Sequence, residues 1–177
     1  MKQHLSIIQE GIIKNKDAHT LIKTVDEKNF HLSLKFLGDL NTPAIEKTLT
    51  VLQGLSSKYH SFKIVLSKRL GVFPNFKKPR VIWAGIEEGN NEVKKIYHDI
   101  EKELKDESFY CCDKDFSPHI TLGRVKYIKC PKNLADYLIN IQLKDISQVI
   151  HSMELMESTL TRNGPVYTII RSFPFLK

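Results

Sequence analysis

The sequence predicts a fold of the α/β or α+β class, built from two related lobes with a cleft between them. Stretches with the apolar spacing of helices alternate along the 177 residues with stretches that have the alternation of strands. A short pattern of His, aliphatic residue, hydroxyl residue and Leu occurs twice, at 31–34 and at 119–122. No linker, low-complexity run or short-period repeat divides the chain. We therefore expect one bilobal domain over residues 1–177.

In the first half, the helical spacing of apolar residues predicts a helix over 4–14 and another that begins after Asn41. Thr42 suits the N-cap of that second helix, and Pro43 suits its first turn. The remaining expectations for this half are strands over 20–25, 30–37 and 61–70, the second helix continuing to about residue 57, and a loop over 71–79.

In the second half, Asn163-Gly164 between two apolar runs is a strong hairpin signal. Pro131 marks the start of a helix. The other expected elements are a strand over 80–87, a break at 89–91, a helix to about residue 106, a loop over 108–118, a strand over about 119–126, and strands over 147–157 and 165–173.

The composition indicates a globular protein with an anionic partner. Hydrophobic residues make up 41% of the chain, which is enough to build a core. The 27 Lys and Arg residues against 20 Asp and Glu residues give a net charge of +7, which favours nucleic acid as a partner. The same net charge could instead serve only to keep the protein soluble, without a nucleic-acid partner.

The cysteines indicate a reducing compartment. Cys111 and Cys112 are adjacent, Cys130 is the third, and no secretory leader opens the chain, so we expect a cytoplasmic protein without disulfides. No CxxC pair supports a cysteine zinc site. No apolar run of about 18 residues is present, so no membrane span is expected.

The repeated pattern places an imidazole beside a hydroxyl twice. On a strand, residues i and i+2 share a face, so His31 lies with Ser33 and His119 lies with Thr121. Because an imidazole titrates near neutrality, one histidine can accept a proton while the other donates one, as cleavage of a phosphodiester requires. The hydroxyls would hold the phosphate oxygens. We expect no metal and no other cofactor, and a zinc site would need a third ligand that no spacing nominates.

Basic residues near these histidines are candidates for binding phosphate. Arg124 would offer a bidentate guanidinium, provided that a twist or a bulge at Gly123 turns it to the face of His119. Residues 68–80 contain five basic residues, two aromatic residues and no acidic residue. This stretch either binds RNA, through its charges and rings, or is a loop exposed to solvent. One His-x-Ser/Thr-Leu is common by chance, whereas two copies are more specific. The other five histidines are read as surface or core residues.

With these residues in view, the chain resembles the 2H phosphoesterases, and among them the RNA 2′,3′-cyclic phosphodiesterases, also called 2′-5′ RNA ligases. The resemblance covers nearly the whole chain. It is carried by Phe-His-Leu-Ser-Leu-Lys-Phe-Leu-Gly at 30–38, Gly-Val-Phe-Pro-Asn at 71–75, Pro-Arg-Val-Ile-Trp at 79–83, Pro-His-Ile-Thr-Leu-Gly-Arg-Val at 118–125, and the closing segment at 158–174.

This resemblance implies an α+β fold with two antiparallel sheets flanked by helices, a pseudo-twofold axis and a central cleft. It implies hydrolysis of the 2′,3′-cyclic phosphate at an RNA end to a 2′-phosphomonoester, with a possible 2′-5′ ligase activity. His31 would donate a proton to the leaving 3′ oxygen and His119 would accept one from water. Ser33, Thr121 and Arg124 would bind phosphate.

The sequence departs from the family pattern at two points. Ser33 stands where Thr is usual, and the strand that commonly precedes the first helix is expected to be missing. The partner is expected to be RNA or a nucleotide with a cyclic phosphate, and the protein a monomer. An RNA- or nucleotide-binding module with little or no turnover is the alternative.

Overall fold

The structure is a computed structural model, and it describes residues 1–105, 116–162 and 164–177. The chain divides into two compact units. Unit 1 comprises Met1–Ser33, Ile64–Asn90 and Ser117–Gln148, and unit 2 comprises Leu34–Lys63, Asn91–Phe116 and Val149–Lys177.

Unit 1 is built on an antiparallel sheet. The five-stranded sheet has the order β1-β4-β3-β2-β5, so the strand that begins with the second histidine, β4, lies between β1 and β3. The strands are β1 (Thr20–Thr24), β2 (Phe62–Phe73), β3 (Val81–Glu88), β4 (His119–Ile128) and β5 (Ser147–Ile150).

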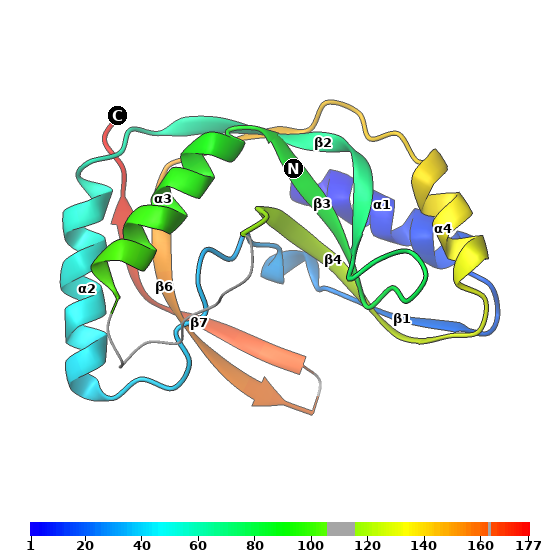
Figure 1. The fold of residues 1–177 in the computed structure, drawn as a ribbon, viewed down its shortest axis with the longest axis horizontal. Coiled ribbons are helices and arrows are strands. Elements are labelled where there is room, and N and C mark those ends of the chain that lie inside the picture. Colours follow the sequence, from blue (N-terminus) through cyan, green and yellow to red (C-terminus); the bar gives the residue numbers. More distant parts are fainter. Residues whose placement is uncertain (106–115, 163) are drawn as a thin grey trace. The chain divides into compact units, whose positions relative to one another are not determined.

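Two helices supply apolar side chains to the core of unit 1. Helix α1 (Lys2–Asn15) lies against β4 and beside α4 (Pro131–Asn140), as Figure 1 shows in blue and yellow. The strands bury every second residue, and the helices add their own apolar faces. The buried residues of this unit include Leu5, Ile12, Ile22, Ile82, Ala84, Ile120, Leu122, Val125, Leu134 and Leu138.

Unit 2 packs two helices with a two-stranded antiparallel sheet. The helices are α2 (Thr42–Ser56) and α3 (Asn90–Glu103), and the strands are β6 (Ser152–Thr161) and β7 (Gly164–Pro174). Helix α2 lies against both strands (Figure 1). The core cluster consists of Ala44, Leu49, Leu52, Leu55, Tyr59, Ile96, Ile100, Leu104, Met153, Leu155, Phe173 and Phe175.

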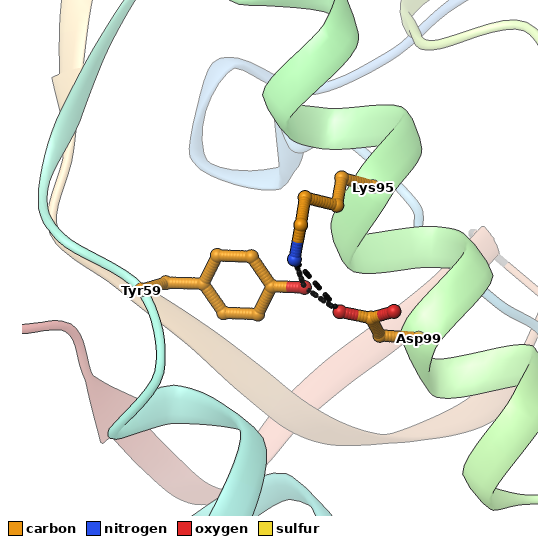
Figure 2. A network of polar contacts seen from close by, with 3 residues as sticks. All are labelled: Tyr59, Lys95 and Asp99. Carbon is orange, nitrogen blue, oxygen red and sulfur yellow. Dashed lines mark hydrogen bonds and ion pairs between the residues drawn. The ribbon is translucent and has the colours of Figure 1, made fainter.

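A polar network joins the segment after α2 to helix α3 in unit 2. The Tyr59 hydroxyl donates a hydrogen bond to Asp99, and Lys95 Nζ lies 3.1 Å from the same carboxylate (Figure 2). Lys95 Nζ also lies 4.7 Å from the centre of the Tyr59 ring, within the range of a cation–π contact. The ring of Tyr59 is thus buried, while its hydroxyl group contacts the charged pair on α3.

The expected α+β class with two antiparallel sheets is confirmed, but several boundaries were wrong. The predicted strand over 30–37 is reduced to an isolated bridge at Leu32. Strand β2 continues through 71–73, which were expected to begin a loop. Asn41, not Thr42, caps α2, because its side-chain oxygen accepts the N–H of Ala44 at 3.0 Å.

One predicted strand is split into two in the structure, and one predicted loop lies mostly outside the described residues. The predicted strand over 147–157 is two strands, β5 and β6, separated at His151. Most of the loop predicted over 108–118, with Cys111 and Cys112, lies outside the described residues. In the part of the chain that the structure describes, no helix is long and apolar enough to cross a membrane.

Candidate active site

The first histidine follows a single turn of 3₁₀ helix. The turn, η1 (Glu27–Asn29), is capped by Asp26, whose side chain accepts the N–H of Lys28 at 3.1 Å. The chain then becomes extended, and Phe30 is buried. His31 Nδ1 lies 2.6 Å from the carbonyl oxygen of Asn29. The imidazole is therefore held by backbone two residues before it.

The second histidine is held in the same way. His119 begins β4, and its Nδ1 lies 2.7 Å from the carbonyl oxygen of Ser117. A carbonyl only accepts, so Nδ1 carries the hydrogen in both rings. Nε2 is then the nitrogen that accepts a proton in the neutral ring and donates one in the protonated ring. The two imidazoles thus share the same contact at Nδ1.

The two histidine motifs run side by side in opposite directions within unit 1. Leu32 forms an antiparallel bridge with Ile120. An antiparallel register centred on this bridge sets His31 opposite Thr121 and Ser33 opposite His119. The bridge residues share one face, and the two histidines and two hydroxyls share the other. Those four side chains are all partly exposed, whereas Ile120 is buried.

A β-bulge brings Arg124 to the histidine face of β4. Val81 pairs with Arg124 and Trp83 pairs with Thr121, so β4 has one residue more than β3 in this interval. The extra residue is Leu122, and it is buried, as is its neighbour Gly123. Strict alternation resumes after the bulge, and Arg124 is exposed on the side of His119 and Thr121. Of the two distortions expected at Gly123, a twist or a bulge, the structure contains a bulge.

Two aromatic rings pack against His119. The centres of the Phe73 and His119 rings lie 5.0 Å apart with an angle of 79° between the planes. The ring centre of Trp83 lies 5.8 Å from that of His119. Trp83 also stacks on Phe73, with the ring centres 4.9 Å apart. These edge-to-face and stacked geometries are favourable for aromatic rings. They limit the orientations open to the imidazole.

Phe73 and Trp83 were not predicted from the sequence to be part of the site. The available signal was Gly71, because a glycine inside a strand often marks a close approach of another group. The five other histidines, at positions 4, 19, 60, 98 and 151, are exposed. Within the described ranges, no group of three His, Cys, Asp or Glu side chains is arranged to hold a metal ion.

Comparison with known proteins places the chain in a family. The family model of the LigT-like phosphoesterases matches residues 2–83 and 85–167. A protein of Aquifex aeolicus named RNA 2′,3′-cyclic phosphodiesterase is 33% identical over 94% of this chain and 88% of its own length. A protein of Methanocaldococcus jannaschii with the same name is 34% identical over 94% of this chain and 93% of its own length.

Solved structures agree with this result. A crystal structure of a Thermus thermophilus protein has a TM-score of 0.81 at 25% identity and covers 98% of this chain and 91% of that chain. The structure of Escherichia coli LigT with 3′-AMP has a TM-score of 0.79 at 17% identity, covers 100% of this chain and 94% of that chain, and supports the fold. The resemblance to the 2H phosphoesterases is confirmed, and the chain belongs to the LigT-like phosphoesterase family.

Proposed function

We propose that this protein hydrolyses the 2′,3′-cyclic phosphate at the end of an RNA to a 2′-phosphomonoester, with His31 and His119 as the acid and the base. The observation that carries the proposal is the antiparallel bridge between Leu32 and Ile120. It brings two imidazoles with the same Nδ1–carbonyl contact to one face of unit 1. The name shared by the relatives from Aquifex aeolicus and Methanocaldococcus jannaschii supports the substrate.

The two histidines divide the proton transfers. Nε2 of neutral His119 accepts a proton from water as the water oxygen attacks phosphorus. The bond from phosphorus to the 3′ oxygen breaks, and Nε2–H of protonated His31 gives its proton to that oxygen. The products are a 3′ hydroxyl and a 2′-phosphate, and the next cycle begins when His119 has released its proton and His31 has regained one.

The neighbouring polar groups bind the phosphate. In the register set by the bridge, the hydroxyl of Ser33 lies across from His119 and that of Thr121 across from His31, so each can donate to a non-bridging oxygen. The Arg124 guanidinium, exposed on the same face, offers paired donors to a phosphate. Ser33 keeps the hydroxyl of the threonine that the family pattern prefers.

Two further features support the setting that we propose for the reaction. All five proposed site residues belong to one unit of one chain, which supports a monomer as the active form. Cys130 is an exposed free thiol, which supports the reducing environment of the cytoplasm. Light scattering on the purified protein tests the first of these points.

The test is an assay of purified protein on RNA that ends in a 2′,3′-cyclic phosphate, with 2′- and 3′-phosphate products resolved. His31→Ala and His119→Ala are each expected to lower kcat by about 10²–10⁴-fold. His4→Ala, a change at an exposed histidine of α1, is the matched control and leaves the rate unchanged. Unchanged turnover in either His31→Ala or His119→Ala, with the fold verified by circular dichroism, would refute the mechanism.

A further inference from the structure

The histidine face of the sheet continues beyond the catalytic residues into an exposed surface. Lys23 pairs with Arg124, and Leu21 pairs with Tyr127, across β1 and β4. Paired residues point to the same side of a sheet, and Leu21 and Lys23 are two positions apart on β1. These four residues therefore lie on the face of His119, and we call them the outer platform. Leu21 and Tyr127 are each 59% exposed, and Lys23 and Arg124 are exposed as well.

The segments that form and border the outer platform are basic. Strands β1 and β4 and the loop over 74–80 contain no Asp or Glu. The loop lies at the same end of the sheet, because Val125 N–H donates to the carbonyl oxygen of Arg80 at 2.9 Å. The exposed basic residues of these three segments are Lys23, Lys77, Lys78, Arg80, Arg124 and Lys126.

The platform and the proposed catalytic site share one strand. Tyr127 comes eight positions after His119 on β4, a span of about 25 Å at the usual rise of a strand. Arg124 lies between them. A single nucleotide bound at His119 does not cover this length, whereas an oligonucleotide of several nucleotides does. The exposed ring of Tyr127 is a surface on which a base can stack, and the surrounding cations suit the backbone phosphates.

We propose that the outer platform binds the single-stranded body of the RNA that lies 5′ of the cyclic phosphate. A base stacks on Tyr127 and packs against Leu21, while Lys23 binds a backbone phosphate. This inference rests on the proposed function, and it assigns to the protein a preference for an RNA oligomer over a free nucleotide. The preference comes from contacts with sugar-phosphate and ring faces, so it carries little base selectivity.

The experiment compares a nucleoside 2′,3′-cyclic phosphate with a short RNA oligomer that ends in the same nucleotide. Tyr127→Ala is expected to raise KM for the oligomer about fivefold or more, because stacking is lost, without a comparable change for the nucleotide. Tyr127→Phe keeps the ring and restores the KM. Ile139→Ala, at a 49% exposed residue of α4, is the matched control and changes neither KM.

A binding measurement separates this proposal from the proposed function. Fluorescence anisotropy with an RNA that ends in a 3′ hydroxyl reports binding without chemistry. Lys23→Gln is expected to weaken binding and to reduce the slope of log K against log salt by about 0.7, the value for one phosphate on a single strand. Lys132→Gln on α4 leaves the slope unchanged.

The outcomes are distinct. Turnover of both substrates with the same KM, and no effect of Tyr127→Ala on either, would overturn the platform and leave the phosphodiesterase intact. Absence of turnover by the unmodified protein, with RNA binding still weakened by Tyr127→Ala and Lys23→Gln, would overturn the proposed function and support the platform.

Discussion

Gly71 on β2 lies directly beneath the indole of Trp83 on β3. The two residues are register partners, and a Cβ at position 71 would stand 2.2 Å from Cζ2 of Trp83. The indole can lie flat over β2 only because position 71 has no side chain. In that place Trp83 stacks on Phe73, and both rings contact His119. A glycine on one strand thus determines what packs against a proposed catalytic base on another.

Gly71→Ala is expected to lower both stability and turnover. The added methyl group forces the indole to move, and overpacking of this kind costs about 1–3 kcal/mol in the free energy of unfolding. Urea denaturation measures that cost. Gly54→Ala is the control, since a Cβ at position 54 on α2 meets nothing within 4 Å. That change is expected to stabilise the protein by about 0.5–1 kcal/mol. Equal stability of Gly71→Ala and the unmodified protein would contradict the close contact.

Trp83→Leu is expected to lower kcat more than it changes KM. The imidazole of His119 loses a ring against which it packs at 5.8 Å, and misplacement of a catalytic group by about 1 Å can reduce a rate by about 10²-fold. Among the described residues, the buried Trp83 Nε1 has no hydrogen-bond partner, so the substitution breaks no hydrogen bond. Trp83→Phe, which keeps an aromatic ring, is expected to restore part of kcat.

The control for Trp83→Leu is an aromatic residue in unit 2. The ring centre of Phe175 lies 5.9 Å from that of Tyr59 and 6.2 Å from that of Phe62. Phe175→Leu therefore removes comparable aromatic packing at a place away from the histidines. It is expected to lower stability without lowering kcat at a temperature where the protein is folded. An equal loss of kcat in both variants would show that Trp83 acts through general stability.

Tyr59→Phe is expected to remove a pH-dependent part of the stability. The hydrogen bond from Tyr59 and then that from Lys95 lower the pKa of Asp99 below 3.8. The stabilisation from the carboxylate is therefore present above that ordinary value and is lost as the pH falls through the lower folded-state pKa. Burial first, and then the bond to Asp99, raise the pKa of Tyr59 above 10.0. Its contribution is present below that pH and is lost as the pH rises through the folded-state value.

The free energy of unfolding of Tyr59→Phe should therefore differ most from that of the unmodified protein between these limits. We expect a difference of about 1 kcal/mol at neutral pH, which shrinks in acid. Tyr127→Phe, at a residue that is 59% exposed, is the control and is expected to change the free energy of unfolding little at neutral pH. A difference that stays constant down to the pH at which carboxylates are protonated would show that the Asp99 bond contributes nothing.

Sequence periodicity predicted the elements of this fold better than their pairing. The alternation over 30–37 predicts that His31 and Ser33 lie on one side, and the bridge at Leu32 is consistent with that prediction. A strand also needs a neighbour, and only Leu32 has one in the described chain, so the ladder is a single bridge. Pairing depends on residues far away in the sequence, and local patterns do not report it.

The two strands at the site show the same contrast. A distortion beside Gly123 was predictable, because Arg124 needed either a twist or a bulge to reach the face of His119, and the structure contains the bulge. The packing of Trp83 over Gly71 was missed, because Gly71 was read as the start of a loop. The sequence alone does not distinguish a glycine that permits a turn from one that makes room for an aromatic ring, whereas the structure does.

Gln9 is expected to control the bulge that orients Arg124. Its buried Nε2 donates to the carbonyl oxygens of Val25 at 2.8 Å and of Leu122, the extra residue of the bulge, at 2.6 Å. Gln9→Met keeps the size of the side chain and leaves both carbonyls without this donor. We expect it to lower the free energy of unfolding by about 1–3 kcal/mol and, because the bulge loosens around Arg124, to raise KM for the cyclic phosphate.

Gln9→Glu separates the hydrogen bonds from simple packing. A carboxylate cannot donate to the two carbonyls, and burial disfavours its charge, so this variant is expected to be less stable than Gln9→Met at neutral pH. Part of the stability should return as the pH falls, because the protonated carboxyl can donate again to Leu122 or Val25. Gln53→Met, at an exposed position of α2, is the control for the change of side chain. If Gln9→Glu matched Gln9→Met at every pH, the donor at position 9 would not be what holds the bulge.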